Sequence, residues 1–158
     1  MAVRSPRLAA ATLLAAALLA GCVGGDAPQP AQFVAPAPAV ADLDGALRAH
    51  YNLLPTLSLG EAVARQYGIA RAPGSALLVV ALRRVDGEGV EHPADGRLQA
   101  QARDLSGRRA PIALRPVSTG DYVDHIGVLP VSPRDVVRID VQVDADGRRQ
   151  SFDFQRHF

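Results

Sequence analysis

Apolar and polar residues alternate with a period of two in most segments after residue 46, and this pattern constrains the fold more than any other feature. The clearest run has Val137, Ile139, Val141 and Val143 on one parity and Arg138, Asp140 and Gln142 on the other. Successive side chains of a β-strand point to opposite faces of its sheet, so this run indicates a strand with one buried face. The chain is therefore expected to be mainly β.

Seven segments carry strand patterns and are separated by turn sequences. They are 47–53, 76–82, 98–102, 110–114, 122–128, 137–143 and 152–158. Segment 76–82 is apolar on both parities, which predicts a strand that is buried on both faces. Pro111 and Pro116 favour a sheet edge, and Asp146-Gly147 is a strong hairpin turn. This number of short strands predicts an antiparallel, immunoglobulin-like β-sandwich.

One short helix is expected after the first strand. Ser58 and Glu61 match a capping box, in which the serine side chain caps the first helical turn. Apolar residues follow at helical spacing, and Gly68 is suited to a helix end. The sequence thus predicts a helix that is capped by Ser58 and ends near Gly68.

The first 21 residues have the features of a bacterial lipoprotein signal peptide. Arg4 and Arg7 precede an apolar run at 8–20, which is too short to span a bilayer comfortably. The run ends in the tetrapeptide Leu-Ala-Gly-Cys at residues 19–22, which resembles a lipobox.

This resemblance implies cleavage before Cys22 and acylation of its thiol and of the new amine. Several acyl chains together anchor a protein durably to a membrane. Val23, rather than aspartate, follows the cysteine, which in enterobacterial lipoproteins implies sorting to the outer membrane. We therefore expect an outer-membrane lipoprotein of the cell envelope that faces the periplasm.

The chain then divides into three parts. Residues 1–21 are the expected signal peptide, residues 22–42 a Pro/Ala-rich flexible linker, and residues 43–158 the β-sandwich domain. The repeated Ala-Pro steps of the linker favour an extended chain.

Composition excludes several classes of function. The chain has 17 basic and 16 acidic residues, so it lacks the basic field that nucleic-acid binding requires. All basic residues are arginine, which excludes a lysine Schiff base. Cys22 is the only cysteine, so neither an intramolecular disulfide nor a cysteine zinc site can form.

Catalytic and metal-binding patterns are not evident. The four histidines, His50, His92, His125 and His157, lie in separate segments without ligand spacing. No serine lies in a Gly-x-Ser-x-Gly elbow, and the paired aspartates fall at turns. We expect no metal, no cofactor and no enzymatic activity.

A group of residues around the predicted helix resembles the DUF4426 family, a bacterial envelope domain of unknown function. These residues are His50-Tyr51-Asn52, Tyr67-Gly68-Ile69, Arg71, Leu59, Glu61, Val63 and Ala64. The resemblance continues to Phe158 through the strand 77–82, Leu105, Gly107 and the aromatic strand 152–158. It implies a small, mostly β envelope domain with no established activity or cofactor.

Two residues depart from the pattern of that family. Asp104 stands where an asparagine is usual and Arg108 where a glutamine is usual. These departures weaken the case for a fixed binding site in the polar segment 104–108.

The candidate functional residues are His50, Asn52, Tyr67 and Arg71. Tyr51 has the apolar parity of its strand and is expected in the core, whereas His50 and Asn52 have the polar parity. The favoured interpretation is a structural latch between helix and sheet, and the alternative is a ligand contact.

The predicted function is that of a binding or scaffolding module. Its partners would be the membrane, through lipidated Cys22, and an unidentified envelope protein. The first alternative is a periplasmic small-ligand or metal-handling protein that uses the four candidate residues. The second is a hydrolase accessory domain.

Overall fold

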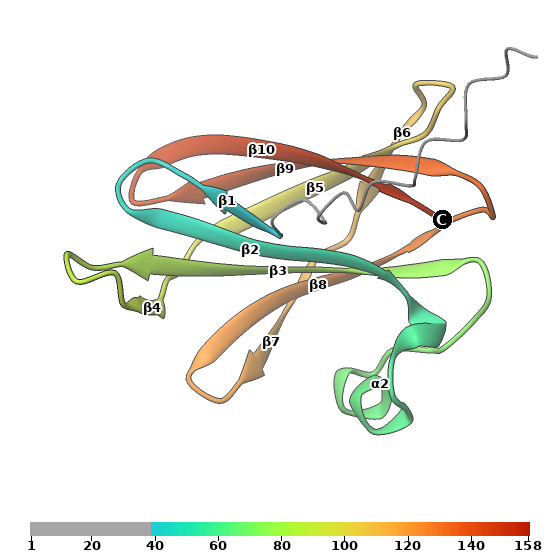
Figure 1. Ribbon diagram of the computed structural model, residues 1–158, viewed down its shortest axis with the longest axis horizontal. Helices are drawn as coiled ribbons and strands as arrows, with labels where there is room; N and C mark the ends of the chain where they lie inside the picture. Colours follow the sequence, from blue (N-terminus) through green and yellow to red (C-terminus); the bar gives the residue numbers. More distant parts are fainter. Residues whose placement is uncertain (1–38) are drawn as a thin grey trace, which may run out of the picture. The chain divides into compact units, whose positions relative to one another are not determined.

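The computed structural model describes residues 39–158; the predicted signal peptide, Cys22 and linker residues 23–38 lie outside the described residues. The described chain forms two antiparallel β-sheets and one short α-helix (Figure 1). No helix in this part of the chain is long and apolar enough to cross a membrane. The predicted mainly β, sandwich-like fold is confirmed, and the immunoglobulin-like strand arrangement stays a prediction.

The two sheets have six and four strands. The first has the order β1-β2-β3-β8-β7, with β4 also paired to β3, and the second has the order β10-β9-β5-β6. The strands of the first sheet are β1 (Val40–Asp42), β2 (Leu47–Pro55), β3 (Ser75–Val85), β4 (Glu91–Pro93), β7 (Arg115–Thr119) and β8 (Tyr122–Pro130). Those of the second are β5 (Arg97–Arg103), β6 (Arg109–Ile112), β9 (Val136–Ala145) and β10 (Arg148–His157).

All seven predicted segments overlap strands, but three short strands were not expected as separate elements. These are β1, β4 and β7, which pair with the longer neighbours β2, β3 and β8. β1 and β4 are too short for a period of two to reveal them, and β7 does not alternate apolar with polar residues. β1 lies at the end of the predicted linker, so ordered chain begins before residue 43. Pro111 and Pro116 lie on the edge strands β6 and β7, as predicted.

The core lies between the facing surfaces of the two sheets. Its buried side chains are Leu47, Ala49, Leu53, Ala76, Leu78, Val80, Leu82, Leu98, Ala100, Ile112, Leu129, Val137, Ile139, Val141, Val143 and Ala145. They occupy alternate positions of the long strands, so the period of two identifies the core face correctly.

Aromatic rings join β2 of the first sheet to β10 of the second. Tyr51 stacks on Phe154 with ring centroids 4.3 Å apart, and its centroid lies 5.2 Å from that of Phe152. All three rings are half-buried and pack against the core. Tyr51 therefore has the packing role that its parity predicts.

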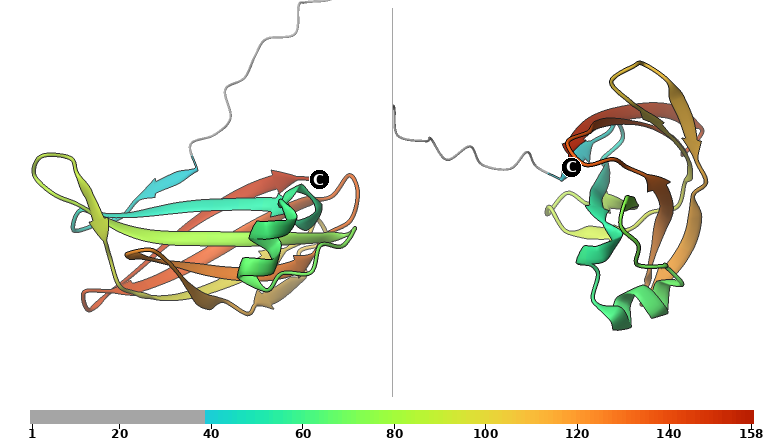
Figure 2. Two further views of the ribbon diagram at one scale, coloured as in Figure 1. Left: turned by 90° about the horizontal axis from the view of Figure 1, so that it is seen from below. Right: turned by 90° about the vertical axis from the view of Figure 1, so that its right-hand side faces the viewer.

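Strand β3 is buried on both faces, as its sequence predicts. Leu77 and Ala81 point away from the second sheet and are nevertheless buried. The helix α2 (Glu61–Tyr67) lies on this outer side of the first sheet, at one end of the strands (Figure 2). Its only buried residue is Ala64.

The predicted capping box is wrong. The helix begins at Glu61 with Gly60 as its N-cap, and no side chain caps it. Ser58 instead ends a 3₁₀ turn, η2 (Thr56–Ser58), and its hydroxyl donates to the Pro55 carbonyl at 2.8 Å. A serine side chain can bond to a nearby backbone carbonyl as well as to a backbone amide of a helix. Here it bonds to the carbonyl in the preceding turn and does not cap the helix.

The helix end near Gly68 is confirmed. Gly68 has φ 63° and ψ 37°, and its amide donates to the Arg65 carbonyl at 3.1 Å. This left-handed conformation suits glycine because it has no Cβ.

Candidate functional site

His50 belongs to a chain of charged side chains on the outer face of the first sheet. His50 Nε2 lies 2.8 Å from Glu91 Oε2. Arg48 donates to Glu91 at 2.9 Å and to Asp42 at 2.7 Å. Hydrogen bonds from Arg48 and then His50 lower the pKa of Glu91, against the effect of burial. This chain of charged side chains links β1 and β4 to β2.

Arg71 and Tyr67 contact other elements. Arg71 donates to the Leu57 carbonyl at 3.0 Å, and its Nη1 lies 3.7 Å from the carboxylate of Glu61. The Tyr67 carbonyl accepts a hydrogen bond from Arg115. Arg71 thus bridges the 3₁₀ turn and the helix.

Asn52 is exposed, and its side-chain amide bonds to no other described residue. No hydrogen bond or ion pair in the described chain joins any two of the four predicted residues. The four residues therefore make no direct polar contact with one another.

A different residue ties the 3₁₀ turn to the chain that follows the helix. The Thr56 hydroxyl donates to the Ala72 carbonyl at 3.0 Å and accepts from the Ala72 amide at 3.1 Å. Thr56 is fully buried and is the only buried polar side chain of the described residues. This contact could not be predicted from the sequence, because its two residues are 16 positions apart and follow no motif.

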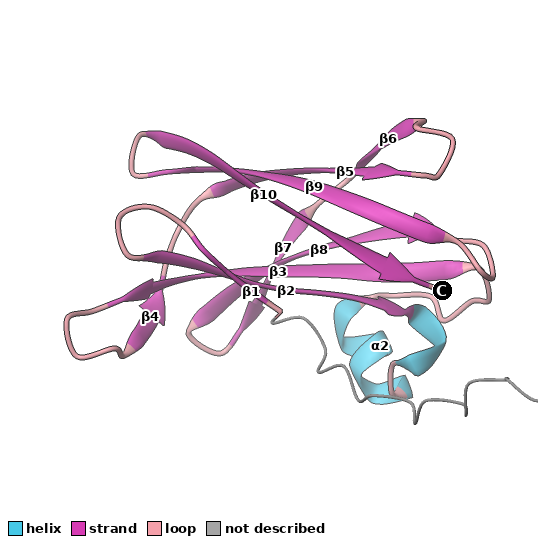
Figure 3. Cartoon of the chain, turned by 45° about the horizontal axis from the view of Figure 1, so that its top comes forward, coloured by secondary structure: helices cyan, strands magenta, loops and turns pink. Residues whose placement is uncertain are grey.

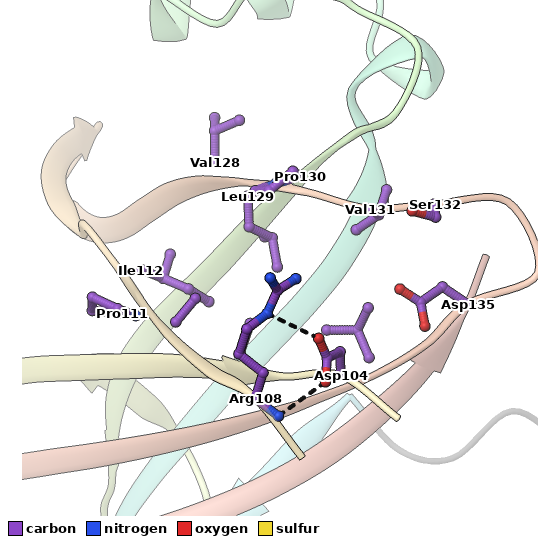
Figure 4. A pocket seen from close by; sticks show the side chains of 13 residues that line it. Asp104, Arg108, Pro111, Ile112, Val128, Leu129, Pro130, Val131, Ser132 and Asp135 are labelled. Carbon is purple, nitrogen blue, oxygen red and sulfur yellow. Dashed lines mark hydrogen bonds and ion pairs between the residues drawn. The ribbon is translucent and has the colours of Figure 1, made fainter. Parts of the chain in front are cut away.

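A cavity of about 210 Å³ lies between the two sheets where strands β6 and β8 separate (Figure 4). Its walls are mainly apolar. The lining residues are Ala102, Asp104, Arg108, Ala110, Pro111, Ile112, Val128, Leu129, Pro130, Val131, Ser132, Asp135 and Val137. Asp104 and Arg108 thus line one cavity.

The turn between β5 and β6 is fixed by the carboxylate of Asp104. Its Oδ1 accepts from the Ser106 amide and the Arg108 amide at 3.0 Å each, and from the Ser106 hydroxyl at 2.6 Å. Its Oδ2 accepts from Arg108 Nε at 3.2 Å. The Ser106 hydroxyl, followed by the Arg108 amide and charge, lowers the pKa of Asp104, against the effect of burial. Asp104 is therefore an ionised, well-held carboxylate.

A second cavity, of about 400 Å³, lies at the same end of the sandwich and shares Val131 and Ser132 with the first. Its lining includes Leu57, Pro73 and Phe158. We call the end formed by η2, α2, the β5–β6 turn, the last residues of β8, the β8–β9 loop and the C-terminus the helix end (Figure 3). Both cavities open there.

The residues that line the first cavity could be found in the sequence only in part. Asp104, Ser106 and Gly107 form a turn pattern, because an aspartate carboxylate bonds to backbone amides that follow it. Sequence analysis identifies the turn but not the cavity. The opposite wall comes from Val128 to Asp135, which only the fold brings near.

In residues 39–158, no group of three or more histidine, cysteine, aspartate or glutamate side chains could hold a metal ion.

Burial is the largest influence on the pKa of His125. It points from β8 toward the core side, and its Nδ1 is buried without a hydrogen-bond partner. Burial lowers its pKa, and the charge of Asp124 opposes this. Asp124 points to the opposite face, where it lies 3.7 Å from Arg83.

The protonation of His125 is expected to destabilise the fold in mild acid. Its folded-state pKa is below the unfolded value of about 6.5. The unfolded state therefore binds more protons, and stability is lost as the pH falls from about 6.5 through the folded-state pKa. We expect His125→Leu to lose less stability than the wild type between about pH 6.5 and 5. Urea unfolding of both proteins across this range measures the difference, since the other histidines are unchanged. If the free energy of unfolding falls equally with pH in both proteins, the expectation is wrong.

Comparisons with known proteins agree with the resemblance seen in the sequence. The family model described as a domain of unknown function (DUF4426) matches residues 42–158. The crystal structure of a DUF4426 family protein from Pseudomonas aeruginosa PAO1 is similar, with a TM-score of 0.63 and 26% sequence identity. That match covers 75% of this chain and 92% of the other. A search of the curated proteins found no match. The matched residues include β2 to β10 and both cavities, and the chain belongs to the DUF4426 family.

Proposed function

We propose that this protein is a lipid-anchored binding module of the bacterial cell envelope. Cys22 carries the lipid, the outer membrane holds it, and the domain faces the periplasm. The charged start, the apolar run and the lipobox-like residues 19–22 support the anchor. The domain binds a partner rather than catalysing a reaction.

The observation that supports binding most is the set of exposed apolar side chains at the helix end. Six large apolar side chains of the described residues are exposed, and four of them belong to this end. The four are Leu57, Val63, Leu105 and Val128. Two of the four, Leu57 and Val128, line the cavities. Exposed apolar side chains beside cavities are typical of a protein interaction site.

The charged groups of the first cavity also favour binding over catalysis. Asp104 and Arg108 bond to each other, and Asp104 has a lowered pKa. A carboxylate that stays ionised well below neutral pH is a poor proton donor at neutral pH. The pair is suited to fixing a loop and presenting a guanidinium group.

Photo-crosslinking in the native bacterium tests the binding surface. A photoreactive amino acid replaces Val128 at the helix end or, as the matched control, Val90 in the β3–β4 turn. Both side chains are similarly exposed. We expect defined crosslinks to an envelope protein from position 128 and none from position 90. Equal crosslinking at both positions, or crosslinks from position 90 alone, would overturn the proposed surface.

The anchor has its own test. Cys22→Ser removes the thiol that receives the lipid, so we expect the protein to leave the membrane fraction or to keep its signal peptide. Fractionation and mass spectrometry of the full-length protein measure both. Tight membrane association of a fully processed Cys22→Ser protein would show that another feature holds it.

A further inference from the structure

The first cavity lies between two strand edges that have no partner on the facing side. β7 pairs with β8 only from Tyr122 to Ile126, so β8 from Gly127 to Pro130 pairs with β3 alone. β6 is the last strand of its sheet and pairs only with β5 in the described chain. Unpaired edges offer backbone donors and acceptors to an added extended peptide. We call the space between them the slot.

The inner end of the slot is closed by a tight backbone crossing. A Cβ atom on Gly127 would lie 2.6 Å from Ile112 Cγ2 and 2.9 Å from the Ala113 carbonyl oxygen. The chain that leaves β6 therefore packs directly on β8 at this point. An extended segment can enter the slot only from the helix end.

The slot has room for one aliphatic side chain. Its apolar lining includes Ile112, Leu129 and Val137, and its volume is about 210 Å³. A 150 Å³ apolar cavity is known to hold a benzene-sized group, so a valine or leucine side chain fits this volume. A long acyl chain does not.

Arg108 offers a guanidinium group at the slot with its outer nitrogens free. Its Nε is bound to Asp104, while Nη1 and Nη2 bond to no other described residue. The side chain is 83% exposed, and its guanidinium group lies beside Leu129 over the cavity (Figure 4). A guanidinium group binds a carboxylate through two parallel hydrogen bonds.

We propose that the slot binds the C-terminus of a polypeptide that ends in an aliphatic residue. The peptide backbone pairs with the free edge of β8, its last side chain fills the cavity, and its carboxylate binds the outer nitrogens of Arg108. This proposal rests on the proposed function, since it names what the binding module recognises.

Asp135 adds a charge preference to the slot. Its carboxylate lines the opposite wall, and its Oδ1 accepts from the Val136 amide at 2.8 Å. A second negative charge on the peptide would be repelled there. The preferred peptide therefore carries a neutral or basic residue before its last one.

Peptide binding to the full-length lipoprotein in detergent tests the proposal. The probe is a fluorescent hexapeptide that ends in Ser-Val with a free carboxylate, and fluorescence anisotropy gives its Kd. We expect the C-terminal amide of this peptide to bind at least tenfold more weakly, because it loses the charge-assisted hydrogen bonds between its carboxylate and Arg108. A peptide that ends in Asp-Val should also bind more weakly than the Ser-Val peptide.

Variants assign the binding to named residues. Arg108→Gln should weaken binding at least tenfold. Arg108→Lys keeps the positive charge but cannot form two parallel hydrogen bonds, and it should weaken binding less. Arg109→Gln changes the neighbouring arginine, which does not line the slot, and should leave the Kd unchanged. Asp135→Asn should tighten binding of the Ser-Val peptide. Thermal unfolding of each variant shows that the domain stays folded.

Three results would overturn the proposal. One is equal affinity for the free carboxylate and the amide, and another is an equal loss in Arg108→Gln and Arg109→Gln. The third is isovalerate binding as tightly as the peptide, which would identify a free short-chain acid as the ligand. If these occur while crosslinks from position 128 persist, the binding module stands and only its C-terminal recognition fails. If the crosslinks are absent as well, both proposals fail.

Discussion

Replacing Tyr51 by alanine is expected to lower the free energy of unfolding by about 3 kcal/mol. Tyr51 contacts Phe152 and Phe154, so the change removes the aromatic contact between β2 of one sheet and β10 of the other. It also leaves a cavity beside the core, against which all three rings pack. A half-buried ring puts the effect at the low end for a large aromatic side chain.

Urea unfolding of a double-mutant cycle measures this effect and its origin. Tyr51→Ala and Phe154→Ala should be less than additive, with a coupling of about 0.5–1.5 kcal/mol for the stacked pair. The matched control is Asn52→Ala, one residue along the same strand, where the side chain is exposed and unbonded. That variant should change stability by less than about 0.5 kcal/mol. A loss in Asn52→Ala as large as in Tyr51→Ala would contradict this account and support the latch.

Replacing Gly127 by alanine is expected to destabilise the domain by about 1–3 kcal/mol, although the change adds only one methyl group. The added Cβ would lie 2.9 Å from the Ala113 carbonyl oxygen, which belongs to the backbone and cannot rotate away. The chain between β6 and β7 must therefore move away from β8. This strand crossing joins the two sheets, so its displacement disturbs both.

Gly87→Ala is the matched control for this prediction. A Cβ on Gly87 meets no atom within 4 Å, and this residue has an ordinary φ. Thermal and urea unfolding of the two variants should show a loss for Gly127→Ala and little change for Gly87→Ala. Equal stability of the two proteins would contradict the close approach of residues 112–114 to Gly127.

Features that depend on neighbouring residues could be predicted from the sequence. The alternation in β9 identifies its core face, because side-chain direction in a strand depends only on position along it. The β9–β10 turn follows from Asp146-Gly147, both of which have positive φ. The end of α2 follows from Gly68 for the same reason.

Features that depend on contacts between distant residues could not be predicted from the sequence. Strands β1 and β4 are three residues each and form because longer strands offer them pairing partners. Ser58 matched a helix cap in sequence, yet its hydroxyl binds the Pro55 carbonyl in the preceding turn. His50 has Glu91 as its partner, 41 residues away.

By itself, the sequence determined the mainly β class, the core-facing parity and the family resemblance, because periodicity and turn chemistry are local. The tertiary structure alone decided where the polar residues meet. It gave His50 and Arg71 partners outside the predicted group, and it placed the Asp104–Arg108 turn opposite β8. Strand order decides such contacts. Strand pairing brings together segments that are far apart in the sequence, and their burial is favourable only when they pack together. No local pattern in the sequence encodes this combined gain.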